Sequence, residues 1–277
     1  MLTEPSALIR RHPLVSFFVL AYGIAWLGAI PFALGAFPVP FFPFGPLVAA
    51  LIVGAASGGR AGTRELLRSM LQWRVAPRWY AFALLVPLAV TLGAAYGSVL
   101  AFGAADPTAS ILAALPSFLP GFALMMLNPL QGSMGEELGW RGVALPRLLA
   151  GRSPLLASLL LGALWAGWHA PLFVTGIYAN PWPHILFLVT STVLFTLLYI
   201  GARGSVLLAM VFHTGWNLAP EVVLLPSFAG AELQQALALY LIIGVAVSVL
   251  ATGLAWPRLT GARPAAIVSP APAPSVV

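Results

Sequence analysis

The chain has 277 residues, of which 60% are hydrophobic and only 7% are charged. Soluble domains usually carry about 25% charged residues, so this composition excludes an ordinary soluble protein. The lack of cysteine in the sequence excludes disulfides, thiolate metal sites and cysteine nucleophiles. The net charge of +6 does not indicate nucleic-acid binding, because the basic residues, all of them arginines, lie between apolar runs and are explained by membrane orientation.

Eight apolar runs approach the roughly 20 residues that a helix needs to cross a hydrocarbon core. They are Leu14–Phe37, Phe41–Ser57, Trp79–Ala104, a long segment within Leu115–Leu145, Pro154–Gly176, His184–Gly201, Ser205–Leu225 and Leu233–Trp256. The first is longer than the apolar region of about 7–15 residues in a signal peptide, so we expect a retained anchor. We predict an all-α polytopic helical bundle, a single domain over 1–262, with a Pro/Ala-rich flexible tail over 263–277.

The distribution of charge predicts the orientation of these spans. With a cytoplasmic N-terminus, every arginine falls in an inner connection, whereas the outer connections carry Asp106 and Glu232. This is the bias expected when positive residues stay inside. The lysine-free, alanine- and arginine-rich composition is typical of bacteria. We therefore expect a multi-pass protein of the bacterial inner (plasma) membrane with both termini in the cytoplasm.

The fourth segment is too long for one straight span. A single helix from Ile111 to Leu149 would extend about 58 Å at 1.5 Å per residue. Pro116, Pro120 and Pro129 supply places where it can bend or break. The residues Gly132-Ser133-Met134-Gly135 indicate a new helix start near Ser133.

Three polar clusters interrupt the apolar runs, although an ionisable residue at mid-bilayer costs about 2.5–3.5 kcal/mol. They are Glu136-Glu137-Leu138-Gly139-Trp140-Arg141, Trp165-Ala166-Gly167-Trp168-His169 and His213-Thr214-Gly215-Trp216-Asn217. Counted from the nearest inner arginine at 1.5 Å per residue, Glu136, His169 and His213 lie at depths of roughly 16, 25 and 15 Å. Helix tilt changes such depths by several ångströms, so we expect the three clusters to meet in one buried polar chamber.

These residue types predict hydrolytic chemistry. A carboxylate beside an imidazole or a metal ion can take a proton from water, and Arg141 can keep Glu137 ionised. His213 and Asn217 are donors that can face the oxyanion of an attacked peptide carbonyl. Alternatively, Glu136, His169 and His213 form a three-ligand zinc site with an open position for water. The sequence leaves metal-bound and metal-free water open.

The three clusters, extended by Gly142 and by Ala170-Pro171-Leu172-Phe173, resemble the motifs of the CAAX-protease and bacteriocin-processing family, also called the Abi family. Its members are intramembrane glutamate-dependent proteases, often classed as metalloproteases. The resemblance, over about residues 115–220, implies that Glu136 is the water-activating base and His169 its partner. It also implies that Glu137 and Arg141 are supports, and that His213 and Asn217 face the oxyanion or metal.

The chain departs from the family pattern at Trp165, where phenylalanine is common four residues before the histidine. Because both residues are aromatic, we expect an altered pocket shape and retained chemistry. Eukaryotic family members clip three residues from prenylated CAAX termini, but the sequence shows no prenyl-binding site. The expected partners are the lipid bilayer and a membrane-associated protein or peptide substrate.

Several purely structural interpretations compete with the catalytic interpretation of these residues. Ser133 and Glu136 have the spacing of a helix capping box, Glu137 and Arg141 that of an ordinary helix ion pair, and a lone histidine is often a packing residue. The function predicted from the three polar clusters together is that of an intramembrane endopeptidase. The alternatives are a transporter or proton relay, since buried Glu and His chains also carry ions, and a scaffold that retains the motifs without catalysis.

Overall fold

A computed structural model describes residues 4–130, 132–178 and 180–261, and this part of the chain is helical without a β-strand. The helices are α1 (Glu4–Arg11), α2 (Pro13–Trp26), α3 (Ala29–Ala33), α4 (Gly45–Ser69), α5 (Pro77–Phe102), α6 (Thr108–Leu127), α7 (Gly132–Gly139), the π-helical turn η1 (Trp140–Ala144), α8 (Leu145–Gly151), α9 (Pro154–Trp168), α10 (Ala170–Val174), α11 (Pro181–Gly201), α12 (Val206–Ser227), α13 (Gly230–Leu254) and α14 (Trp256–Thr260). The all-α bundle is confirmed. The tail predicted over 263–277 lies outside the described residues.

Six helical stretches in the described residues are long and apolar enough to cross a membrane, two fewer than predicted. They are Pro13–Ala33, Pro77–Phe102, Thr108–Leu127, Pro181–Gly201, Val206–Ser227 and Gly230–Leu254. The second predicted span falls in α4, which is kinked at Gly59, where φ is 56°. The fifth falls in α9, whose 15 residues extend only about 22 Å. Helix α9 is shorter than the sequence pattern indicated, whereas α4 has 25 residues and carries charged side chains after its kink.

Helix α4 nevertheless runs back along the whole of α2. At one end the Phe42 N–H donates to the Ala25 carbonyl at 2.8 Å, and at the other Arg10 Nε donates to the Ala56 carbonyl at 2.8 Å. The part of α4 before its kink therefore covers the same depth as α2. Arg10 and the arginines that follow the kink consequently lie at the same end of this helix pair.

The predicted break in the fourth segment is confirmed, and its position follows from the local residues. Helix α6 ends at Leu127 and α7 begins at Gly132. Pro116 and Pro120, expected as possible breaking points, lie inside α6 without ending it. Membrane helices tolerate interior proline when neighbouring groups satisfy the freed carbonyls. The segment thus comprises one helix long and apolar enough to span a membrane, α6, and a separate helical unit, α7 to α8.

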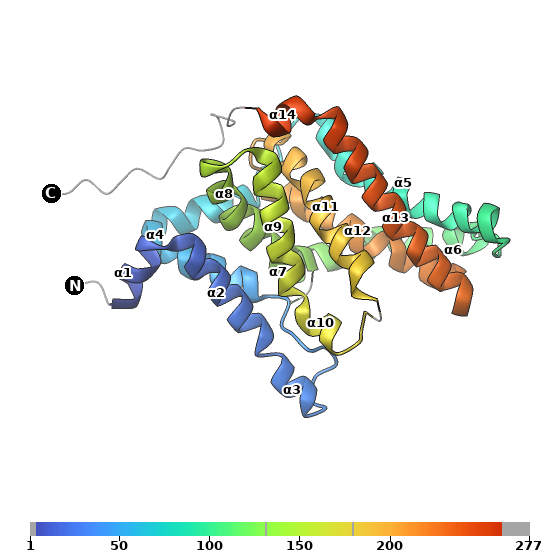
Figure 1. The fold of residues 1–277 in the computed structure, drawn as a ribbon, viewed down its shortest axis with the longest axis horizontal. Helices are drawn as coiled ribbons and strands as arrows, with labels where there is room; N and C mark the ends of the chain where they lie inside the picture. Colours follow the sequence, from blue (N-terminus) through green and yellow to red (C-terminus); the bar gives the residue numbers. More distant parts are fainter. Residues whose placement is uncertain (1–3, 131, 179, 262–277) are drawn as a thin grey trace.

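Helix α12 lies at the centre of the bundle and contacts α5, α6, α7, α11 and α13 (Figure 1). Its side chains from Leu208 to Trp216 are all buried. Helix α9 packs against α11, and α7 packs between α4 and α12. The polar motifs on α7 and α12 therefore face each other in the interior, which is the arrangement that a chamber requires.

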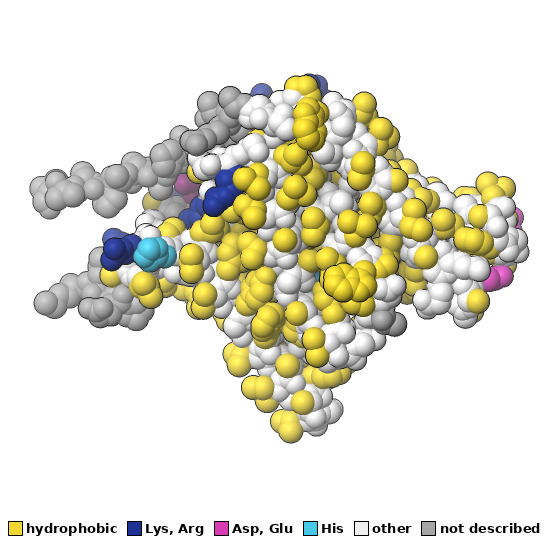
Figure 2. All heavy atoms as spheres, in the orientation of Figure 1, with side chains coloured by type: hydrophobic (Ala, Val, Ile, Leu, Met, Phe, Trp, Pro, Cys, Tyr) yellow, Lys and Arg dark blue, Asp and Glu magenta, His cyan; other side chains and the backbone are white. Residues whose placement is uncertain are grey.

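The outer surface is apolar where lipid is expected. Figure 2 shows a middle covered by hydrophobic side chains, with most of the visible arginine atoms gathered toward the upper left and top. Large apolar side chains such as Leu100, Leu119 and Leu254 are among the most exposed in the molecule. Apolar exposure on this scale marks a lipid-facing surface or an interface. A multi-pass membrane protein accounts for it.

Candidate active site

Two short-range features of the sequence place α7 against its neighbours. Gly135 and Gly139 flank the two carboxylates, and a Cβ on Gly139 would lie 2.7 Å from the Pro46 carbonyl oxygen. A Cβ on Gly135 would lie 2.8 Å from the Pro129 carbonyl oxygen. These glycines let α7 pack directly against α4 and the preceding turn. Glu136 and Glu137 are thereby held in the interior, with Glu136 only 5% exposed and Glu137 fully buried.

Helices α7 and α12 meet in an antiparallel register that joins the first and third motifs. A Cβ on Gly132 would lie 3.4 Å from Asn217 Nδ2, and Ser133 Oγ is hydrogen-bonded to Thr214 Oγ1 at 2.8 Å. One turn further along α7, Glu137 contacts His213. About one turn forward along α7, from Gly132 to Glu137, thus corresponds to one turn back along α12, from Asn217 to His213.

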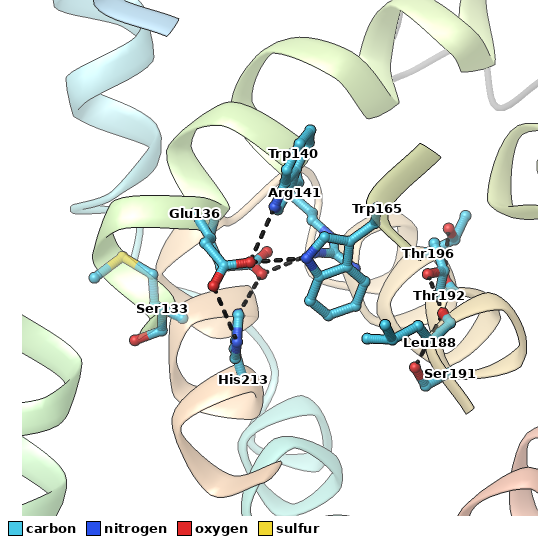
Figure 3. A network of polar contacts seen from close by, with 12 residues as sticks. Ser133, Glu136, Trp140, Arg141, Trp165, Leu188, Ser191, Thr192, Thr196 and His213 are labelled. Atoms are coloured by element: carbon cyan, nitrogen blue, oxygen red, sulfur yellow. Dashed lines mark hydrogen bonds and ion pairs between the residues drawn. The ribbon is translucent and has the colours of Figure 1, made fainter. Parts of the chain in front are cut away.

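Both oxygens of the Glu136 carboxylate have defined surroundings (Figure 3). Oε2 accepts two indole N–H groups, from Trp140 Nε1 at 3.1 Å and from Trp165 Nε1 at 2.8 Å. Oε1 faces His213 Nε2 at 4.0 Å. The carboxylate is therefore fixed by donors on one oxygen, while the other is directed at an imidazole without a direct hydrogen bond.

Glu137 joins the imidazole to a buried guanidinium. Its Oε1 accepts from His213 Nδ1 at 2.7 Å and from Arg141 Nη1 at 2.8 Å. Because a carboxylate only accepts, Nδ1 of His213 carries the hydrogen, and Nε2 is the ring nitrogen that faces Glu136. The Glu137–Arg141 pair was predicted from its helical spacing, and the structure shows that it also orients His213.

Arg141 is fully buried among aromatic rings. Its guanidinium carbon lies 3.7 Å from the centroid of Phe195 and 4.8 Å from that of Trp165, distances that favour cation–π attraction. In the described part of the chain, Nε and Nη2 of Arg141 and Oε2 of Glu137 have no hydrogen-bond partner. Apolar groups thus enclose the ion pair. Removal of either charge would leave the other buried without compensation.

Among the described residues, His169 and Asn217 are not hydrogen-bonded to either carboxylate. His169, half-buried at the junction of α9 and α10, donates from Nδ1 to the Trp165 carbonyl at 2.9 Å, which leaves Nε2 free of that bond. No hydrogen bond or ion pair among the described residues joins it directly to Glu136; Trp165 contacts both. Asn217, also half-buried, lies beside the first turn of α7. Of the residues expected to meet in one chamber, Glu136, Glu137, Arg141 and His213 lie within 4.0 Å of one another in a chain of contacts, whereas His169 and Asn217 lie at its edge.

Sequence reasoning missed the indole donors. Trp140 lies four residues after Glu136 on one helix, and that spacing is a signal for the contact that the structure shows. Trp165 was expected to change only the shape of the pocket, yet it bonds to Glu136 from 29 positions away. The capping-box interpretation does not account for the site, because Ser133 bonds to Thr214 and Glu136 to the indoles.

A three-ligand zinc site makes a specific demand on the positions of its donor atoms. Zinc ligands lie about 2.0–2.2 Å from the ion, so their donor atoms must converge closely. Among the described residues, no three His, Asp or Glu side chains are grouped to hold a metal ion. Glu136 Oε1 and His213 Nε2 face one another, but His169 does not complete the set. The zinc site from Glu136, His169 and His213 remains a prediction.

Fold and site together define a class: a polytopic helical membrane protein with a buried carboxylate, imidazole and guanidinium site. Comparison with known proteins is consistent with that class. Residues 116–219 match the family model of type II CAAX prenyl endopeptidases, described as Rce1-like. A CAAX prenyl protease 2 from Methanococcus maripaludis is 32% identical over 117 residues, which are 39% of this chain and 43% of that protein.

The segment that carries the three motifs therefore matches the CAAX-protease family, the family that the motifs resemble. Its bounds agree closely with the 115–220 expected from the sequence. The aligned region is less than half the length of the relative, so the family likeness is established for the motif-bearing core. That core includes α7, α9 and α12, which carry the site.

Proposed function

We propose that the protein is an intramembrane endopeptidase that hydrolyses a peptide bond with a water molecule activated by Glu136. The observation that carries the proposal is the placement of Glu136 Oε1 opposite His213 Nε2, 4.0 Å apart, inside a buried cluster. The match to type II CAAX prenyl endopeptidases over the same helices supports the choice of reaction. Transport has no comparable support from the geometry.

The gap between the two groups has the dimensions of a water bridge. Hydrogen bonds to water oxygen are about 2.8 Å long, so a water can contact two atoms that lie 4.0 Å apart with a bond angle of roughly 90°. Such a water donates to Oε1 of Glu136 and accepts from a protonated Nε2 of His213. Protonated His213 also balances the charges of the cluster, because two carboxylates then face one guanidinium and one imidazolium.

The proposed reaction conserves atoms and protons. Oε1 of Glu136 takes a proton from water while the water oxygen forms a bond to the peptide carbonyl carbon, giving a tetrahedral oxyanion. Glu136 then passes that proton to the amide nitrogen as the C–N bond breaks and the carbonyl re-forms. The products are a carboxylic acid and an amine. These transfers use only side chains of the chain and one water molecule.

The other motif residues have distinct proposed tasks. His213 directs Nε2–H toward the oxyanion, held in that orientation by Glu137. Arg141 donates to the same Glu137 oxygen and holds that carboxylate in place. Asn217, one turn along α12, supplies a second donor for the oxyanion. His169 supports the water from the side of α9, through the nitrogen that its bond to the Trp165 carbonyl leaves open.

The proposed substrate is a membrane-anchored protein or peptide whose scissile bond enters from the bilayer. The relative is named a CAAX prenyl protease, and a lipid-anchored chain terminus is the matching substrate class for this chain. We place the protein in a bacterial inner membrane with both termini cytoplasmic. In that topology α4 and α9 cross in addition to the six long helices, which returns the arginine-bearing connections to one side.

The test is cleavage of a membrane-anchored peptide by the protein reconstituted in lipid vesicles. Glu136→Ala and His169→Ala are expected to lose activity, whereas Glu232→Ala, an acidic residue in the first turn of α13, is expected to retain it. Folding of each variant is checked by its unfolding midpoint in detergent. Equal cleavage by the wild type and both site variants would contradict the proposal.

A further inference from the structure

Trp165 contacts four residues of the site: Glu136, Arg141, His169 and His213. Its indole N–H reaches Glu136, its carbonyl oxygen accepts from His169, and its ring lies 4.8 Å from the guanidinium carbon of Arg141. The same ring meets His213 edge to face, with centroids 5.5 Å apart. It is 4% exposed. One side chain on α9 therefore links residues of α7, η1 and α12.

The hydrogen bond to Glu136 determines which carboxylate oxygen is left for chemistry. Oε2 already accepts from Trp140, and the second indole at 2.8 Å supplies another donor on that oxygen. A carboxylate oxygen with two N–H donors has little remaining capacity to take a proton. Oε1, which faces His213 Nε2 at 4.0 Å, is the oxygen that remains. The two indoles come from different helices, so together they also fix the rotation of the carboxylate.

We infer that Trp165 is a positioning residue whose indole N–H locks Glu136 so that only Oε1 is presented to the water and to His213. This inference rests on the proposed function for its kinetic consequence, but the hydrogen bond itself does not. It goes beyond ring packing, because a phenylalanine would keep the aromatic contacts with His213 and Phe195 and would lack the donor.

Trp216 provides a matched control on α12. It is as buried as Trp165, at 5% exposure, and also packs among aromatic rings, but its Nε1 has no hydrogen-bond partner in the described part of the chain. The substitution Trp216→Phe removes an equivalent N–H without touching Glu136. Any general cost of shortening a buried indole therefore appears in both variants, whereas loss of the carboxylate donor appears only in Trp165→Phe.

The kinetic test compares these variants in the reconstituted cleavage assay. A hydrogen bond to a charged group corresponds to about a ten- to hundredfold effect, so Trp165→Phe is expected to lower kcat by that factor with KM within about twofold. Trp140→Phe is expected to lower kcat similarly, and the double variant further. Trp216→Phe is expected to retain the wild-type kcat. An unchanged kcat in Trp165→Phe, or an equal fall in Trp216→Phe, would overturn the inference.

A spectroscopic test separates this inference from the proposed function. In protein labelled with ¹⁵N at the indole nitrogens, the Trp165 N–H signal is identified by its loss in Trp165→Phe. It is expected to move upfield in Glu136→Ala, because the donor loses its carboxylate, whereas the Trp216 signal stays in place. An unchanged chemical shift of the Trp165 N–H in Glu136→Ala would refute the hydrogen bond, even if cleavage requires Glu136. A shifted signal together with undiminished cleavage by Glu136→Ala would instead refute the proposed function.

Discussion

Removal of one member of the buried Glu137–Arg141 pair is expected to cost more stability than removal of both. The two charges are 2.8 Å apart and fully buried, so their attraction is about 6 kcal/mol at an effective dielectric constant of about 20. Breaking a buried pair by deleting one partner typically costs about 3–5 kcal/mol, because the other charge stays buried without compensation. We therefore expect Glu137→Gln and Arg141→Met each to lower the free energy of unfolding by about that amount.

The double variant Glu137→Gln/Arg141→Met leaves no uncompensated charge at this position. Neutral replacements of similar volume often cost little, so we expect a loss below about 2 kcal/mol, less than for either single change. Part of that loss comes from the cation–π contacts of Arg141 with Phe195 and Trp165, which are worth up to about 2 kcal/mol when desolvated.

The assay is reversible unfolding in mixed detergent micelles with increasing dodecyl sulfate, followed by tryptophan fluorescence and extrapolated to zero denaturant. All four proteins, including the wild type, form a double-mutant cycle that isolates the coupling between the two side chains. Additive losses, or single losses below about 1 kcal/mol, would refute the reasoning that the pair is a buried and mutually dependent unit.

Two further predictions concern packing and topology. A Cβ on Gly162 of α9 would lie 2.7 Å from the Val189 backbone of α11, so Gly162→Ala is expected to lose about 1–3 kcal/mol of stability, while Gly23→Ala, with no atom within 4 Å, changes it by less than about 1 kcal/mol. Similar unfolding midpoints for the two would contradict close packing of α9 on α11. Because the chain has no cysteine, Asp106→Cys and Arg203→Cys can each be labelled with an impermeant maleimide, and we expect them to react from opposite sides of the membrane. Reaction from the same side would exclude the proposed orientation.

The sequence predicted those parts of the site that depend on local periodicity and depth. The spacing of four in Glu137 and Arg141 follows from helix geometry, and the structure pairs them directly. The similar depths counted for Glu136 and His213 correspond to facing turns of α7 and α12. The break before Ser133 was indicated by glycine and proline chemistry and lies where α7 begins.

Features set by contacts between distant helices were not predictable in the same way. The bond from Trp165 to Glu136 depends on where α9 lies relative to α7, and no spacing in the sequence encodes that placement. The second span was predicted to end at Ser57, but the helix continues to Ser69 through a kink at Gly59, after which α4 carries its arginines. The pairing of His169 with Glu136 stays a prediction, and the structure gives His169 a hydrogen bond from Nδ1 to the Trp165 carbonyl.

The central claim is that Glu136 removes a proton from the attacking water, and the substitution Glu136→Gln tests it most directly. Glutamine keeps the size of the side chain and a carbonyl oxygen for the two indoles, but it cannot take up a proton in place of Oε1. In single-turnover cleavage of a membrane-anchored peptide, the rate is expected to fall by about 10²–10⁴-fold. The unfolding midpoint is measured in parallel, and the assay is run where the variant is fully folded. A rate within about threefold of the wild type would show that Glu136 is not the base.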